Sequence, residues 1–227
     1  MFRHLFTDLI LHHLPFFKFF GVIMGLLSNT VSITRYKIEG EISSSIMDTV
    51  SNGLKNHKII DIDKDVQEMA VGWTTFENPY LTDFETTSFI YGNYIVFSLR
   101  IDKKSIPSKM VNKIYSFEVE RKLKESDREF LSRNEKKQIK DQVIHSLCLR
   151  IPPTPNTYDI LWNYEESVLW FFSTQKSANE EFETLFTKSF KLTPIRLFPY
   201  TIADLMFNLS DKDRDRITQL SPTKFTE

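Results

Sequence analysis

Apolar and polar positions alternate along 30–40, TVSITRYKIEG, which predicts a β-strand that closes at Gly40. The runs MAVGWTTF at 69–76 and YIVFSLRID at 94–102 are rich in β-branched and aromatic residues, so we expect two further strands there. Between them, 77–93 has no such period. It is expected to form a loop whose aromatic side chains fold back onto the core.

Two more strand signals and a polar tail follow later in the chain. The apolar runs of 158–174 flank the polar residues NYEES, which is the pattern of a hairpin. A last strand is expected in 192–200, at the edge of a sheet, because Pro194 has no N–H to donate to a neighbouring strand. From Asp211 onward the chain is polar and is expected to fray.

Apolar residues recur with a helical period in four segments, 43–57, 106–127, 132–150 and 177–190. The third segment begins with SRNE, a capping box in which a serine is followed three residues later by a glutamate. The order β-α-β-β-α-α-β-β-α-β predicts an α+β fold. Its sheets would be mixed or antiparallel, with packed helices and a protruding pair of basic helices.

The first residues differ in character from the rest of the chain. Residues 1–23 are aromatic and apolar but are interrupted by histidine, aspartate, proline and lysine, so no run reaches the length of a membrane-spanning helix. A helix on a membrane surface remains an alternative. We expect an extension over 1–23, with Met24 as the start of the ordinary protein, then a domain over 24–209 and a polar tail over 210–227.

The charge of the chain is unevenly distributed. It has 29 basic and 30 acidic residues, a net charge of -1. Between Arg100 and Arg150 there are 14 basic and 8 acidic residues, a local balance of +6, which leaves -7 for the remainder. A basic segment in an otherwise acidic chain indicates a surface for a polyanion. The candidate DNA-binding residues on this predicted helix pair are Arg121, Lys122, Lys124, Arg128, Arg133, Lys136, Lys137 and Lys140.

An alternative interpretation of the same residues is a solvated helix face. Glu118 with Lys122, and Lys137 with Asp141, have the i,i+4 spacing of weak ion pairs. Against this, the first turn of the second helix carries cations where the helix dipole favours anions. Such a turn, with free N–H groups, is well placed to meet a phosphate.

Few enzyme motifs are present. The chain has six glycines and neither a P-loop nor a dinucleotide-binding motif, and it has no zinc-finger, helix-turn-helix or RNP pattern. Its one cysteine, Cys148, excludes an internal disulfide and is expected in the core. His145, beside the apolar stripe, is expected to be partly buried and hydrogen-bonded. We predict no catalytic residue, no metal site and no cofactor.

A metal-dependent nuclease is the main enzymatic alternative, and it needs clustered carboxylates. The best candidates are Asp61, Asp63 and Asp65 in DIDKD. Val66 stands where a calcium loop requires glycine, so solvated acids are the preferred interpretation.

Five segments, in this order and at this spacing, resemble the RdgC family of recombination-associated proteins. They lie between about Met24 and Ala203: GLLSNTVSITRYKIEG, VGWTTF, YIVFSLRIDKKSIPSKMV, LSRNEKKQIKDQVIHSL and YDILWNYEESVLWFFSTQKSANEEFETLF. The resemblance implies an α+β protein that forms ring-shaped homodimers, binds double-stranded DNA with little sequence preference and restrains the RecA recombinase. Some members carry the label of an exonuclease. Long members continue past the last residue here, so we expect a short form.

The residues and the resemblance together predict a sequence-nonspecific, double-stranded DNA-binding protein. As a homodimer it would coat or encircle DNA and restrain RecA-type strand exchange, in the cytoplasm and associated with the nucleoid, with no membrane partner. The alternatives are a metal-dependent DNA exonuclease and a protein-interaction module that uses the aromatic loop 76–94 or the apolar leader.

Overall fold

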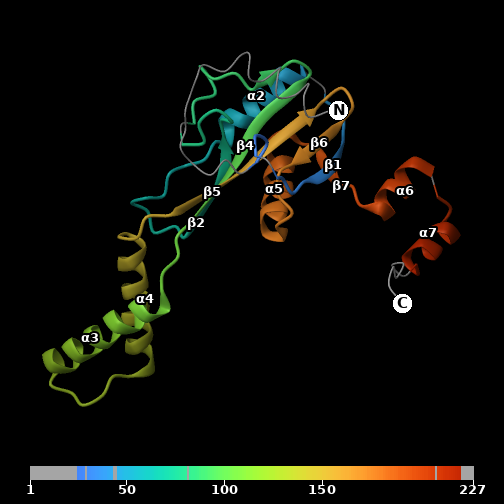
Figure 1. Cartoon of the computed structure of the whole chain (residues 1–227). Helices are drawn as coiled ribbons and strands as arrows, with labels where there is room; N and C mark the ends of the chain where they lie inside the picture. Colours follow the sequence, from blue (N-terminus) through green and yellow to red (C-terminus); the bar gives the residue numbers. More distant parts are fainter. Residues whose placement is uncertain (1–24, 29, 43–44, 81, 208, 221–227) are drawn as a thin grey trace.

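The computed structural model describes residues 25–28, 30–42, 45–80, 82–207 and 209–220 (Figure 1). The predicted extension over 1–23 therefore lies outside the described residues, and so does the end of the predicted tail. The fold is α+β, as predicted: a curled antiparallel sheet is packed against helices, and a helix pair projects from one end of the sheet (Figure 1).

The sheet has seven strands in the order β2-β4-β5-β6-β1-β7, with β3 paired to β4, and every pair between named strands is antiparallel. The predicted strands are confirmed, and β7 lies at an edge as Pro194 indicated. Two differences are the short β3 inside the predicted loop and the early start of β5, at Thr154. The bounds are Thr34–Glu39 (β1), Met69–Thr74 (β2), Ile90–Tyr91 (β3), Tyr94–Lys103 (β4), Thr154–Asn163 (β5), Val168–Phe171 (β6) and Thr193–Arg196 (β7).

An aromatic core lies between the sheet and two helices, α2 (Ile46–Asn56) and α5 (Lys176–Phe190). Phe182 is at its centre, with its ring centroid 4.8 Å from that of Phe171 and 5.0 Å from that of Tyr36. The two helices approach closely because α2 has a glycine at the contact: a Cβ on Gly53 would come within 2.5 Å of a side-chain carbon of Phe190. The helix pair, described next, extends from the sheet that this core supports.

The helix pair consists of α3 (Ser108–Ser126) and α4 (Arg133–Cys148), inserted between the long paired strands β4 and β5. It projects beyond the end of the sheet (Figure 1). Its side chains form a second apolar cluster that shares no residue with the sheet core. The buried members are Val111, Leu131, Ile139, Val143 and Leu147.

The chain after β7 is helical, which the sequence did not predict. Helix α6 covers Pro199–Phe207 and α7 covers Asp211–Thr218, so the expectation of a frayed chain from Asp211 is wrong for α7. Ser210 caps α7 by accepting a hydrogen bond from the N–H of Asp213, and an ion pair joins Arg214 to Asp204 of α6. Caps and ion pairs, rather than an apolar stripe, form this helix, which explains why periodicity did not reveal it.

Candidate nucleic-acid interface

The start of α4 is fixed by the predicted capping box, which is confirmed. The Ser132 hydroxyl accepts a hydrogen bond from the N–H of Glu135 at 3.3 Å, and the Glu135 carboxylate accepts one from the N–H of Ser132 at 2.9 Å. Two backbone donors at the helix end are thereby satisfied. The cap sets where the helical period begins, and hence which later residues share a face.

Four cations lie on one face of α4, immediately after this cap. Their spacing is i, i+3, i+4 and i+7, which brings side chains together along a helix. All four are exposed, and none forms an ion pair with another described residue. We call this face the α4 strip: Arg133, Lys136, Lys137 and Lys140.

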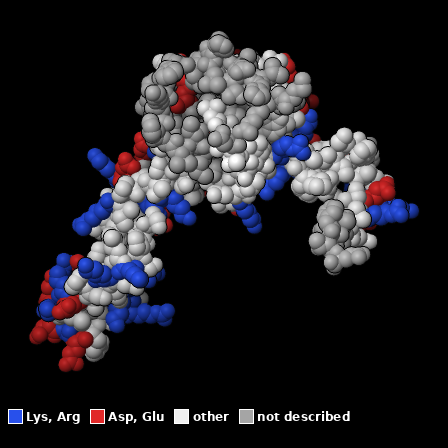
Figure 2. Space-filling view, in the orientation of Figure 1, with Lys and Arg blue, Asp and Glu red and all other residues white. Residues whose placement is uncertain are grey.

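The other predicted site residues, on α3 and the α3–α4 connection, have mostly acidic neighbours. Three of them form ion pairs: Arg121 with Glu118 at 2.6 Å and Glu125 at 3.5 Å, Lys124 with Glu120 at 2.8 Å, and Arg128 with Glu135 at 2.7 Å. Lys122 is exposed and has no such pair among the described residues. Figure 2 shows acids mixed among the bases at the far end of the helix pair.

The ion pairs differ from those that spacing predicted. Neither Glu118–Lys122 nor Lys137–Asp141 is formed, and Glu118 bonds instead to Arg121. A guanidinium offers several donors in a fixed fork, so an arginine three residues away competes well with a lysine four away. Exposed pairs of this kind contribute at most about 1 kcal/mol, so they can be exchanged for contacts with phosphates.

The capping carboxylate makes the start of α4 sensitive to acid. The N–H of Ser132, then Arg128 and the Ser132 hydroxyl, lower the pKa of Glu135 to about 2. Its stabilising effect is complete above the ordinary glutamate pKa of about 4.3 and is lost as the pH falls through the folded value. We therefore expect Glu135→Gln to unfold more easily than the parent at pH 7, with the difference shrinking steadily towards pH 2. Urea unfolding at a series of pH values measures it; a difference that stays constant with pH would contradict this role.

The three aspartates considered for a metal site lie outside the helix pair, and their carboxylates do not form a cluster. Asp61 accepts a hydrogen bond from Arg100 at 3.0 Å, and the side chains of Asp63 and Asp65 are exposed. Within the described part of the chain, no group of three or more histidine, cysteine or acidic residues could hold a metal ion.

Two single-residue predictions have different outcomes. Cys148 is buried, as predicted. The prediction for His145 is wrong because it is exposed. It lies two residues after Val143, about 200° around a helix of 3.6 residues per turn, and so points away from the core.

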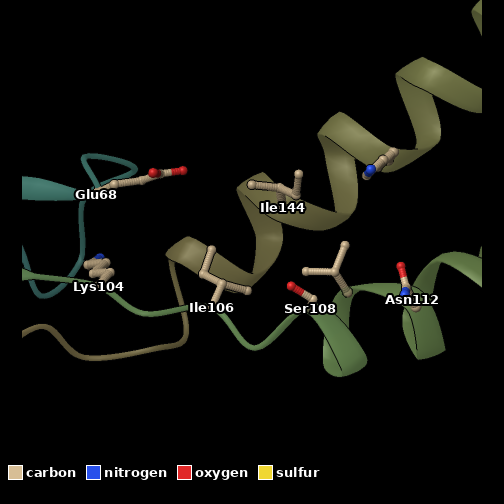
Figure 3. A pocket seen from close by; sticks show the side chains of 8 residues that line it. Glu68, Lys104, Ile106, Ser108, Asn112 and Ile144 are labelled. Carbon is tan, nitrogen blue, oxygen red and sulfur yellow. The ribbon is translucent and has the colours of Figure 1, made fainter.

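A pocket of about 330 Å³, between the helix pair and the sheet, adjoins the inner end of the α4 strip. Lys140 lines it, together with Glu68 and Lys104 from the sheet side and Ser108 and Asn112 from α3 (Figure 3). Spacing gave no signal for this pocket, because its walls come from segments far apart in the sequence.

Comparison with known proteins gives one family. A family model described as "Putative exonuclease, RdgC" matches residues 31–205, most of the chain, and confirms the resemblance seen in the sequence. No curated protein matches the chain. The description of the family names an exonuclease, so the expectation of a non-enzymatic protein remains a prediction. No helix among the described residues combines the length and apolar character needed to cross a bilayer.

Proposed function

The chain belongs to the RdgC family, which suggests a recombination-associated nucleic-acid-binding protein, and from this premise we propose a more specific function. It binds double-stranded DNA without sequence preference. As a homodimer, it coats or encircles the duplex and restrains RecA-type strand exchange on the nucleoid.

The α4 strip is the observation that supports the proposal. Four exposed cations lie on one face of a capped helix, and no described acid neutralises them. Contacts between such side chains and phosphates fix the position of a protein on DNA but carry no information about bases. The helix pair that carries the strip projects beyond the end of the sheet (Figure 1).

Dimerisation would place two such strips on one duplex. The second strip would then bind at a high effective concentration, so the affinity of the dimer would exceed that of either strip alone. Analytical ultracentrifugation with and without duplex DNA tests the dimer. A strand-exchange reaction with a RecA-type recombinase, run at increasing protein concentration, tests the restraint.

Salt dependence tests the mode of binding and counts the contacts. Each phosphate contact contributes about -0.9 to the slope of log K against log salt. Per protomer, we expect about -3.6 if only the α4 strip binds and about -7 if all eight predicted cations do. Fluorescence anisotropy with two unrelated duplexes of equal length, between 50 and 200 mM salt, measures this. Affinity that is insensitive to salt, or that differs greatly between the duplexes, would refute the proposal.

The family description keeps an exonuclease as the second candidate function. Digestion of end-labelled duplex in the presence of Mg²⁺ or Mn²⁺ distinguishes the two. Activity that Asp63→Asn abolishes would favour the enzyme, whereas DNA that is shifted in a gel and remains full-length would favour the binding protein.

A further inference from the structure

The helix pair is joined to the sheet by little apolar packing. Its buried cluster and the core of the sheet have no residue in common. Two chain connections, 104–107 and 149–153, join the helix pair to the sheet, and the first contributes Lys104 and Ile106 to the wall of the pocket described above. In Figure 3, Glu68 and Lys104 lie at one end of this pocket and Ser108 and Asn112 at the other, so close packing does not fill the junction. Another interaction must set the angle between the two units.

Lys104, just after β4, provides such an interaction. Its residue is only 4% exposed. The ammonium group donates to three backbone carbonyl oxygens: that of Cys148 at 2.6 Å, that of Asp65 at 2.7 Å and that of Asp63 at 3.4 Å. These use all three of its donors. The side chain therefore joins the end of β4, the loop around 63–65 and the end of α4.

The bond to α4 is favourable for two reasons. Cys148 is the last residue of α4, and its carbonyl is among those that have no partner within the helix. The C-terminal end of a helix also carries partial negative charge, which stabilises a cation. If α4 turned away, a buried ammonium would lose one of its acceptors, which is costly.

The loop around 63–65, which accepts two of the hydrogen bonds from Lys104, is itself anchored to the sheet. Arg100 of β4 bonds to Asp61 and, at 2.6 Å, to buried Asp102. Ile62, next in the chain, is 1% exposed. The Arg100–Asp61 ion pair alone would hold the loop only weakly, because the Asp61 side chain is 71% exposed. The buried side chain of Ile62, beside Asp61, fixes the loop against the sheet. Lys104 thus ties α4 to a fixed point of the sheet.

We propose that Lys104 is a positioning residue that fixes the direction of the helix pair, and with it the α4 strip, relative to the sheet. Its effect on orientation is independent of any ligand. Its effect on DNA rests on the proposed function, because a strip that samples many directions is competent to bind for only part of the time.

Distances between two spin labels test the orientation directly in the full chain. Asn134→Cys places one label on α4 and Lys188→Cys places the other on α5; both positions are exposed, whereas native Cys148 is buried. We expect a narrow distribution of distances in the labelled parent and a broad or displaced one after Lys104→Met. Circular dichroism establishes that the variant is folded. If Lys104→Met does not fold, Lys104→Gln is used in its place. Glutamine keeps N–H donors but not the charge, so this variant should give intermediate broadening.

Lys103→Met is the matched control. It removes the same charge from the adjacent residue, whose side chain is exposed and has no ion pair among the described residues. It should leave the distances unchanged. A folded Lys104→Met or Lys104→Gln protein with the narrow distribution of the parent would overturn the proposal, and so would equal broadening by Lys103→Met.

DNA affinity separates this proposal from the proposed function. If the competent orientation falls to about a tenth of the population, Lys104→Met should weaken binding roughly tenfold. If Lys104→Met loses the narrow distance distribution, the positioning role is supported, whether or not the affinity for DNA changes. Failure of the parent itself to bind DNA would overturn the proposed function and leave the distance result standing.

Discussion

Replacing Lys136, Lys137 and Lys140 together by glutamate should lower the affinity for duplex DNA by at least about two orders of magnitude at ~0.15 M salt. Each lost phosphate contact costs about 0.7 logarithmic units at this salt, and the new carboxylates repel the backbone in addition. The loss should be similar for any sequence, and the salt slope should fall by about 2.7 per protomer. Anisotropy titrations at several salt concentrations measure all three effects.

A variant of equal charge provides the control. Lys58→Glu/Lys188→Glu/Lys212→Glu changes three exposed lysines outside the helix pair, none of which forms an ion pair with a described residue. It shifts the net charge by the same amount and should reduce affinity far less, because long-range repulsion is screened beyond about 8 Å at physiological salt. Equal losses in the two triple variants would remove the α4 strip from the interface.

Phe182→Ala should cost about 3–5 kcal/mol of unfolding free energy, the range for a large aromatic side chain removed from a core. The ring is 0% exposed and contacts rings from β1, β6 and α5 itself, as well as Trp73 of β2. The cavity would lie between the sheet and α5, where main-chain hydrogen bonds prevent collapse. Urea unfolding followed by circular dichroism measures the loss.

Phe117→Ala is the control for this prediction. The substitution is the same, but Phe117 lies on α3 and is 60% exposed. Alanine is also the better helix former, so the change should stay within about 0.5 kcal/mol. A cost below about 1 kcal/mol for Phe182→Ala would show that the aromatic core is less closely packed than the ring distances indicate.

The local pattern predicted most of the elements because each signal acts over a few residues. The alternating positions of β1, the capping box of α4 and the proline of the edge strand β7 are each confirmed. Helix α7 was missed for the same reason, since its stability comes from a cap and from an ion pair to α6 rather than from an apolar stripe. His145 was misplaced because it is adjacent to core residues in sequence but not on their helix face.

For the candidate site, the spacing of cations could be predicted but their partners could not. The α4 strip follows from the helical period and from the position of the cap at Ser132. The acids that neutralise Arg121, Lys124 and Arg128 follow from which side chains reach which donors, and this requires geometry. No pattern distinguished Lys104 from Lys103, although one is buried and the other exposed.

The sequence by itself determined the family, the order of the strands and helices up to β7 apart from the two-residue β3, and the concentration of positive charge between Arg100 and Arg150, because periodicity and composition are properties of neighbouring residues. Only the tertiary structure decided the order of strands in the sheet, the pairing of charges and the bonds of Lys104 to three distant carbonyls. The β4–β5 and β1–β6 pairings and the bonds of Lys104 join residues about 40 positions apart or more, and such contacts exist only once the chain has folded around its core. The charge pairs of the helix pair join residues only three to seven positions apart, but which acid each base reaches depends on side-chain geometry that spacing does not give.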